Sequence, residues 1–305
     1  MPQTPPAGHR PRSGSLPISI PHLGAIALQK LRPVHIEHWH GTIGRAGGKE
    51  GRPLSARTVG HAHRVLHRAL RRAVDDQTLF RNVASVIPPP KVEAQEIEIL
   101  SAEQIADVLA KLDGHALYPI ATMALATGMR RGELLALRWG DLDLSGATVT
   151  VKRSLEETRA GLRFKTPKTK YGRRTISLPP SSVDALRIHR RQQLELRIAL
   201  GQGRPGPTAL VFSTVEGSPM SPDNLSRDWR RVTAARKLPP VKFHALRHTH
   251  ASALIASGLD VLTISRRLGH ASPVVTLAIY GHLFGDTDRK AASAIEVALR
   301  TSVEH

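Results

Sequence analysis

Three consecutive prolines, Pro88 to Pro90, interrupt the chain. Proline lacks an amide hydrogen and fixes its own φ angle, so this run ends any preceding helix and stiffens the connection to the next segment. A chain of 305 residues is long enough for two domains that each bury a core. We therefore predict a boundary between about residues 82 and 99, with a first domain over residues 20–85, a linker over 86–99 and a second domain over 100–300.

The first domain is predicted to be helical. Apolar residues recur at helical spacing from Leu31 to Ile43 and from Ser55 to Gln77, and Ser55 is suited to cap the second helix. The other face of that helix is rich in arginine and suits a phosphate backbone, which Arg57, Arg64, Arg68 and Arg71 are predicted to contact. Residues 1–19 are rich in Pro, Gly, Ser and Arg and are predicted to form a disordered basic arm.

The second domain is predicted to be mainly α-helical with one small antiparallel β-sheet. Ser101 and Gln104 match a capping box, and Ser221 followed by Pro222 is typical of a helix start. Strands are predicted over residues 147–153 and 174–178, with a strongly basic loop between them. Helices are predicted over about residues 101–112, 116–127, 131–138, 181–200, 222–236, 245–256, 260–268, 273–281 and 288–300.

Composition narrows the class of protein. The formal charge of +19 and the pI near 11.2 indicate a polyanionic partner, most commonly nucleic acid. Because the chain has no cysteine, disulfides, thiol nucleophiles and thiolate metal sites are excluded. The sequence has neither a secretory signal nor an apolar run near the roughly 20 residues that a membrane span needs. We expect a soluble, cytoplasmic protein that does not contact a membrane.

Two pairs of residues suggest chemistry on a phosphate. His244 and Arg247 are three residues apart and share one helical face, but a chain with 16 histidines gives about two such pairs by chance. Arg130 and Glu133 have the same spacing, so the carboxylate can orient the guanidinium; an ordinary surface ion pair is the alternative. Tyr280, taken alone, would be a core aromatic residue.

Three segments together resemble the motifs of the tyrosine recombinases, the phage integrase family. They are Thr127 to Trp139 (TGMRRGELLALRW), His244 to Ser252 (HALRHTHAS), and the Leu-Gly-His that ends at His270 followed by Tyr280-Gly-His-Leu. The resemblance covers roughly residues 22 to 300. It implies a two-domain clamp around duplex DNA, in which a SAM-like helical core-binding domain precedes a DNA breaking-rejoining catalytic domain.

The resemblance also implies an activity and its residues. The expected protein is a site-specific recombinase that cuts and rejoins DNA through a 3′-phosphotyrosine, in the integration or excision of a phage or mobile element. Tyr280 is the implied nucleophile and Glu133 an acidic helper. The implied phosphate-activating residues are Arg130, His244, Arg247 and His270. The family's hairpin lysine is matched best by Lys168, with Lys170 as the alternative. Further DNA contacts are predicted from Lys165, Lys170, Arg173 and Arg174.

Physical chemistry supports these roles. A phenol with a pKa near 10 needs a proton acceptor at neutral pH, and an imidazole such as His244 is suited to that task. Two guanidinium groups match the negative charge that develops on the nonbridging phosphate oxygens. The leaving 5′-hydroxyl needs an acid, which a lysine beside the DNA can supply. Because one phosphate ester replaces another, no cofactor, metal or ATP is required.

The resemblance further implies partners. They are double-stranded DNA, a homotetramer assembled on two DNA sites, and an accessory DNA-bending or directionality protein, all in the cytoplasm at the nucleoid. The first core-binding helix and an arm-binding domain are not visible in residues 1–19. The chain is therefore expected to be either a naturally short form or a truncated remnant that binds DNA but recombines poorly.

Three other interpretations compete with this one. His244, His248 and His250 have spacings that suit a metal site, although no carboxylate completes it and Arg247 would lie beside the cation. Residues 245–268 resemble a helix-turn-helix reader, which would make the protein a DNA-binding regulator. A type IB topoisomerase would share the chemistry but would relax supercoils instead of exchanging strands between sites.

Overall fold

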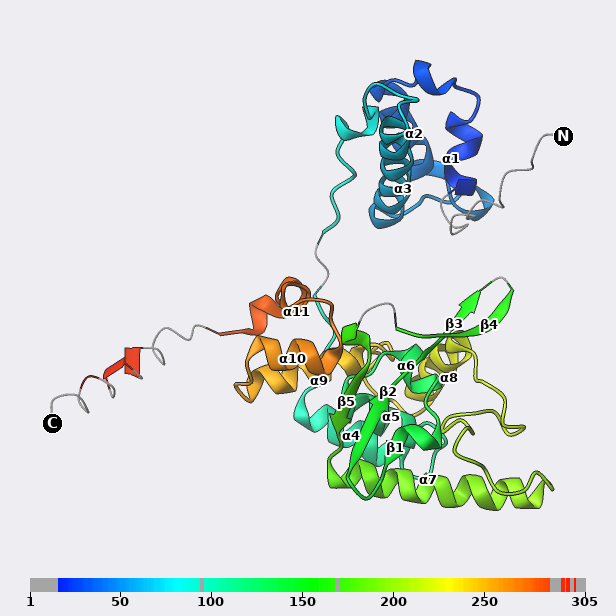
Figure 1. Ribbon diagram of the computed structural model, residues 1–305, viewed down its shortest axis with the longest axis vertical. Coiled ribbons are helices and arrows are strands. Elements are labelled where there is room, and N and C mark those ends of the chain that lie inside the picture. Colours follow the sequence, from blue (N-terminus) through cyan, green and yellow to red (C-terminus); the bar gives the residue numbers. More distant parts are fainter. Residues whose placement is uncertain are drawn as a thin grey trace. The chain divides into compact units, whose positions relative to one another are not determined.

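The structure, a computed structural model, describes residues 16–93, 96–158, 160–167 and 170–285, together with residues 292, 293, 295, 296 and 299 (Figure 1). The chain divides into two compact units, residues 1–95 and residues 96–305. The helix predicted over residues 288–300 lies largely outside the described residues.

The N-terminal unit is a small helical bundle. Its helices are α1 (Leu16–Leu23), α2 (Pro33–Ala46) and α3 (Ala56–Asp75), joined by the short turns η1 (Leu28–Lys30) and η2 (Lys49–Gly51) and followed by η3 (Val83–Ser85). Ser55 caps α3 as predicted, because the Thr58 amide donates to its hydroxyl at 3.3 Å. The core contains Leu31, Ile36, Trp39, Ile43, Val59, Ala62, Leu70 and Ala84.

The start of this unit differs from the prediction. Residues 16–19 were expected to belong to a disordered arm, but they form the first half of α1. Pro17 falls in the first turn, where its missing amide hydrogen removes no helical hydrogen bond. The helix packs on α2 and α3, and Leu23 adds to their core. This segment is thus ordered by its packing on α2 and α3, which its composition alone does not reveal. Residues 1–15 lie outside the described residues.

The C-terminal unit is mainly helical with two small antiparallel sheets (Figure 1). Strands β1 (Leu142–Asp143), β2 (Thr148–Val151) and β5 (Arg174–Ser177) form the first sheet in the order β1-β2-β5. The helices are α4 (Ala102–Leu112), α5 (Tyr118–Thr127), α6 (Arg131–Leu135), α7 (Pro180–Ala199), α8 (Pro222–Ala235), α9 (Ala245–Ala256), α10 (Val261–Leu268) and α11 (Pro273–Tyr280), with the short turns η4 (Trp139–Asp141), η5 (Lys170–Gly172) and η6 (Gly281–Leu283). The central helix α5 is buried on nearly every side and packs against α4, α7 and α9.

The predicted helix starts at Ser101 and Ser221 are confirmed. Ser101 and Gln104 form a reciprocal capping box, and the Ser221 hydroxyl accepts hydrogen bonds from the first amides of α8. Helix α6, however, ends at Leu135 rather than near residue 138. The reason is a competing backbone pairing: the Val211 amide donates to the Leu137 carbonyl at 2.9 Å, and this holds the chain extended.

The predicted antiparallel sheet is confirmed by the pairing of β2 with β5, but the basic segment between these strands, predicted as a loop, forms a second sheet. Strands β3 (Ser154–Thr158) and β4 (Gly161–Lys165) pair as a second, two-stranded sheet in which Glu156 faces Arg163. Apart from Leu155, the side chains of this hairpin are exposed or half-buried. Ion pairs from Glu156 to Arg163 and Lys165 connect its strands. In β4, Leu162 and Phe164 alternate with charged residues, but β3 has Leu155 as its one apolar residue, so the sequence does not show two paired strands.

Candidate active site

The site is built where two helices end. Helix α5 ends at Gly128 and α10 ends at Gly269, and both glycines adopt the left-handed conformation, with φ of 61° and 66°. The last carbonyls of a helix have no partner within the helix, so they attract donors and positive charge. Arg247 on α9 donates to the Gly128 carbonyl at 2.5 Å and to the Leu268 carbonyl at 2.8 Å. The guanidinium of Arg247 therefore connects both helix ends.

Arg130 and Glu133 form the pair that the sequence predicted. Arg130 Nη1 donates to Glu133 Oε1 at 3.0 Å, and the Arg130 amide donates to Oε2 at 3.0 Å. Arg130 Nη2 also donates to the Gly269 carbonyl at 3.2 Å. The Glu133 side chain is 5% exposed, whereas that of Arg130 is 43% exposed. This is a buried carboxylate that orients a solvent-facing guanidinium, not an ordinary surface ion pair.

Arg174 takes a different place from the one predicted. We expected it to contact DNA, but its side chain is only 8% exposed. Its Nη2 donates to Glu133 Oε2 at 2.9 Å, and its Nε donates to the Arg267 carbonyl near the end of α10 at 2.7 Å. The pairing of β5 with β2 brings this arginine beneath the end of α10. Arg174 therefore neutralises Glu133 from the side opposite to solvent.

The charges of these groups leave the site cationic. Burial alone would raise the pKa of Glu133, but the guanidinium of Arg174 and the donors from Arg130 outweigh burial and hold the pKa below its usual value. Burial and the neighbouring Arg130 lower the pKa of Arg247 to about 9, so this group stays charged at neutral pH. Arg130, Arg174 and Arg247 supply three positive charges against the single carboxylate. Such an excess is suited to an anion of the size of a phosphodiester.

His270 is held between Arg247 and α11. Its Nε2 lies 2.9 Å from Arg247 Nη2, and its Nδ1 lies 2.8 Å from the Thr276 hydroxyl. Because a guanidinium can only donate, Nε2 accepts, and the proton of the neutral ring is on Nδ1. Burial and the nearby arginines Arg247 and Arg130 lower the pKa of His270 to about 4. The ring is therefore neutral at pH 7.

Tyr280 ends α11, and its side chain is buried, with 1% exposed. It packs in a small core with Ala251, Ile255, Ile264 and Leu268. Its hydroxyl lies 2.8 Å from Nδ1 of His248. Burial raises the pKa of Tyr280, while the positive charges of Arg247 and Arg130 act against that rise. The phenol is therefore protonated at neutral pH and has an imidazole as its hydrogen-bond partner.

His248 is the residue that the sequence interpretation missed. The sequence interpretation favoured a structural role for His248 over membership of a metal site, and gave the role of proton acceptor to His244. The His244 ring is exposed and lies perpendicular to the His248 ring, with 4.8 Å between centroids. Partial desolvation and the charges of His248, Arg247 and other nearby arginines lower the pKa of His244 to about 4. The i,i+4 spacing of the two histidines was visible in the sequence, but the contact with α11 was not.

His250 points away from both of these rings. Its Nδ1 lies 2.7 Å from the Leu125 carbonyl, and its Nε2 accepts from Arg267 at 3.1 Å. It belongs to the buried contact between α5, α9 and α10. The rings of His244 and His248 are thus in contact, whereas His250 has other partners, and the three histidines of the HALRHTHAS segment do not converge on one point.

The hairpin residues are only partly described. Lys165, a predicted DNA contact, pairs with Glu156 across the hairpin. Lys168, the predicted general acid, lies outside the described residues, and only the backbone of Lys170 is described, in η5. Arg173 is exposed, and its contact with DNA stays a prediction. The structure therefore tests neither lysine.

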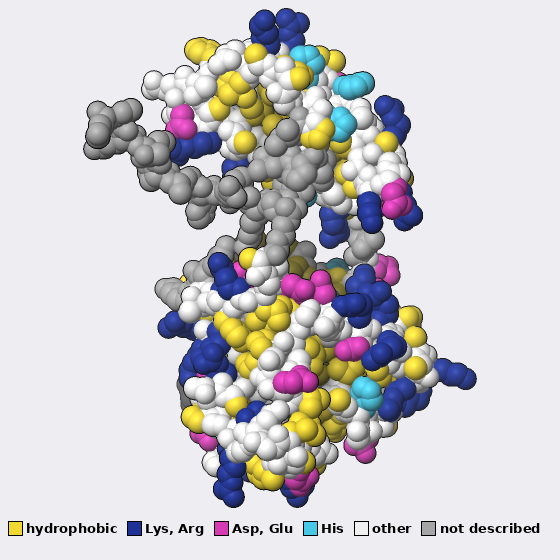
Figure 2. All heavy atoms as spheres, turned by 90° about the vertical axis from the view of Figure 1, so that its right-hand side faces the viewer, with side chains coloured by type: hydrophobic (Ala, Val, Ile, Leu, Met, Phe, Trp, Pro, Cys, Tyr) yellow, Lys and Arg dark blue, Asp and Glu magenta, His cyan; other side chains and the backbone are white. Residues whose placement is uncertain are grey.

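The arginines predicted on α3 lie on its exposed side. Arg57, Arg64, Arg68 and Arg71 are all exposed, and Arg71 donates to Asp75 at 3.1 Å one turn along the helix. Figure 2 shows Lys and Arg side chains distributed over the visible faces of both units. The positive charge is therefore not confined to the neighbourhood of Tyr280.

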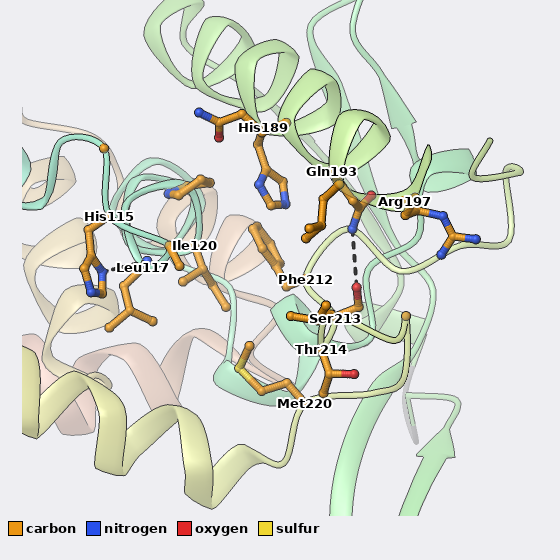
Figure 3. A pocket seen from close by; sticks show the side chains of 17 residues that line it. His115, Leu117, Ile120, His189, Gln193, Arg197, Phe212, Ser213, Thr214 and Met220 are labelled. Carbon is orange, nitrogen blue, oxygen red and sulfur yellow. Dashed lines mark hydrogen bonds between the residues drawn. The ribbon is translucent and has the colours of Figure 1, made fainter. Parts of the chain in front are cut away.

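A separate cavity of about 380 Å³ lies beside α5 and α7 (Figure 3). His115, Ile120, His189 and Phe212 are among the residues that line it, and none of the predicted site residues does. His189 is half-buried, with its Nε2 2.7 Å from the Val211 carbonyl. The cavity is thus distinct from the arginine-rich site. Among the described residues, no helix is both long and apolar enough to cross a membrane.

Known proteins resemble this chain over most of its length. A model of the phage integrase family matches residues 96–286. The tyrosine recombinase XerC-like protein of Caldanaerobacter subterraneus subsp. tengcongensis is 30% identical over 279 residues, which is 86% of this chain and 70% of that protein. The integrase of Mycobacterium phage L5 is 26% identical over 285 residues, or 92% of this chain and 72% of that protein. The chain thus spans 70 to 72% of the lengths of these two relatives.

Solved structures share the fold. The Tn1549 transposon integrase in complex with transposon right end DNA matches with a TM-score of 0.75 at 21% identity, over 92% of this chain and 90% of that one. A lambda integrase dimer bound to a COC′ core site matches with a TM-score of 0.57 at 18% identity, over 89% of this chain and 86% of that one. The mainly helical fold predicted from the sequence is therefore confirmed as an integrase fold.

Proposed function

Because the chain belongs to the phage integrase family, we propose that Tyr280 attacks a DNA phosphodiester held by Arg130, Arg247 and His270. The protein is an enzyme of the tyrosine recombinase class, a site-specific DNA recombinase. We further propose the roles of its site residues, its DNA target and its assembly.

One observation carries the proposal. Helix α9 contributes Arg247 to the arginine-rich site and His248 to the hydroxyl of Tyr280. Adjacent residues of one helix thus join the group that would bind the phosphate to the group that would attack it. A buried tyrosine in a core needs neither three arginines nor an imidazole on its hydroxyl.

The chemistry can be written step by step. The Tyr280 oxygen forms a bond to phosphorus, the bond from phosphorus to the 5′-oxygen breaks, and a 3′-phosphotyrosine and a free 5′-hydroxyl result. Arg130 and Arg247 stabilise the charge on the nonbridging oxygens, and His270, held by Thr276, fixes the guanidinium of Arg247 beside them. We assign protonation of the leaving 5′-oxygen to Lys168, with Lys170 as the alternative. The reverse attack by a 5′-hydroxyl rejoins the strand, so neither cofactor nor metal takes part.

The N-terminal unit is proposed to act as the core-binding domain. The exposed arginines of α3 would follow the DNA backbone, as their spacing on one helix suggests. Double-stranded DNA is the proposed substrate, and a homotetramer on two sites the proposed assembly; a structural relative is the lambda integrase tetramer bound to a Holliday junction. An accessory DNA-bending or directionality protein and a place at the nucleoid in the cytoplasm complete the proposal.

The interpretation as a helix-turn-helix regulator fits the structure less well. The end of α10, which would belong to the reading helix, holds Arg130, Arg174 and Arg247 through its carbonyls. A regulator would have no use for such a site. A type IB topoisomerase would share this site, and so would a remnant that binds DNA but recombines poorly. What each of them does to DNA distinguishes them from an active recombinase.

The experiment starts by defining the DNA target. Tyr280→Phe protein selects bound duplexes from a random library, and a nicked duplex of the selected sequence traps cleaved DNA on the protein. Wild type should form a covalent adduct, Tyr280→Phe should bind with nearly the same affinity and form none, and Tyr118→Phe is the matched control that should still form it. An adduct that persists in Tyr280→Phe would show that the nucleophile is misassigned. Exchange between two copies of the site would then separate a recombinase from a topoisomerase and from a remnant.

A further inference from the structure

We propose that His248, and not His244, is the catalytic residue that takes the proton of Tyr280 during cleavage and returns it during rejoining. The inference deepens the proposed function and rests on it, since it concerns the same tyrosine. It starts from the contact of 2.8 Å between His248 Nδ1 and the Tyr280 hydroxyl. Among the described residues, His248 is the hydrogen-bond partner of the Tyr280 hydroxyl, which is the oxygen that reacts.

The other imidazoles of the site are placed less well. His270 has both ring nitrogens engaged, one by Arg247 and one by Thr276. His244 makes no hydrogen bond to Tyr280 in the described structure, and its ring stands edge-on to His248. His244 is exposed, so its ring can face the DNA instead. A general base must lie within hydrogen-bond reach of the proton that it removes, and His248 meets that condition.

The groups around His248 allow its ring to take up a proton briefly and then to release it. Arg247 on the same helix disfavours the imidazolium, and the carboxylate of Glu98, in the segment before α4, favours it. Burial and Arg247 keep the pKa of His248 below its usual value, so the ring is neutral and able to accept a proton at pH 7. The edge of the His244 ring and the Tyr280 ring complete the surroundings. An imidazolium formed beside Arg247 is driven to give its proton back.

The proton balance of the two steps is closed. In cleavage the phenolic proton moves from Tyr280 to His248 Nδ1 as the bond to phosphorus forms, and the 5′-oxygen takes its proton from the general acid. In rejoining the bond from phosphorus to the tyrosine oxygen breaks and His248 returns the proton to that oxygen, while the attacking 5′-hydroxyl gives its proton to the conjugate base of that acid. Each proton thus returns to the group that supplied it.

The test compares His248→Asn with His244→Asn in the full chain, on the selected duplex. Asparagine places a hydrogen-bonding atom near the position of Nδ1 but cannot take the proton. We expect His248→Asn to bind DNA like wild type, to cleave about 10²- to 10⁴-fold more slowly, and to lose the fall in rate that wild type shows on acidification through the pKa of His248. His244→Asn should lose rate but keep that pH profile. The reverse pattern would overturn the proposal.

A modified substrate separates the base from the acid. A bridging sulfur in place of the 5′-oxygen gives a leaving group that needs no proton. It should restore cleavage to Lys168→Ala but not to His248→Asn, and rescue of His248→Asn would contradict the assignment. If wild type forms no adduct on any selected duplex, the proposed function itself fails. If wild type forms the adduct and His248→Asn forms it at the same rate, only the assignment of His248 fails.

A further measurement needs no variant at position 248, so misfolding of such a variant cannot affect its result. The chain contains three tyrosines, so a ¹³C label on the phenol carbon gives three signals, and Tyr280→Phe identifies the relevant one. In wild type the Tyr280 signal should shift as His248 titrates below pH 6.5, because the hydrogen bond changes when Nδ1 gains a proton. A Tyr280 signal that ignores this titration would refute the contact.

Discussion

Replacing Glu133 with glutamine removes the charge at the centre of the arginine cluster while keeping the shape of the side chain. Its carboxylate accepts from the amide and guanidinium of Arg130 and from two nitrogens of Arg174. Removing one partner of a buried ion pair costs about 3–5 kcal/mol, because the remaining charge stays buried. Arg130 can regain water and Arg174 cannot, so we expect about 3 kcal/mol, or a fall in Tm of roughly 6–12 °C for a unit of this size.

The pH dependence of this loss has a definite sign. The pKa of Glu133 in the folded protein lies below its ordinary value of 4.5, so its contribution to stability is complete above pH 4.5 and is lost as the pH falls through the lower, folded value. The difference in stability between wild type and Glu133→Gln should therefore be largest near neutral pH. It should shrink as the pH is taken well below 4.5.

Calorimetry of the full chain measures the effect, and the transition that moves identifies the C-terminal unit. Asp184→Asn is the matched control, because its ion pair with Arg187 is exposed on both sides and should contribute under about 1 kcal/mol. Cleavage by Glu133→Gln should also slow about 10²-fold, since Arg130 loses the group that orients it. A Tm within a degree of wild type, or a difference in stability that grows toward low pH, would refute this account of the cluster.

Three further predictions address other parts of the chain. Arg64→Ala should reduce the log-log salt dependence of DNA binding by about 0.9, as measured by titration at several salt concentrations, whereas an unchanged slope would remove Arg64 from the interface. Gly269→Ala should destabilise the protein more than Gly201→Ala, as measured by urea unfolding. Both glycines have positive φ, but of the two only Gly269 would place a Cβ against a guanidinium, that of Arg174, at 2.6 Å. Thr276→Val should cost about 1–3 kcal/mol and slow cleavage, because His270 Nδ1 loses its buried partner; equal stability and rate would argue against that hydrogen bond.

Local patterns predicted much of this protein. The caps at Ser55, Ser101 and Ser221 depend on residues a few positions apart, so the sequence shows them directly. The pairing of Arg130 with Glu133 has the same basis, since both belong to one turn of chain. The motif spacing also led to the family, and hence to the fold and the class of reaction.

The structure decided what depends on distant contacts. Arg174 and Glu133 are 41 residues apart, and His248 and Tyr280 are 32 apart. Nothing in a basic stretch distinguishes an arginine that faces DNA from one buried under a helix end, because the pairing of β5 with β2 makes the difference. Likewise, His244 and His248 are chemically equal in the sequence. Only the packing of α11 on α10, which carries Tyr280 to α9, brings one of the two imidazoles to the reacting oxygen.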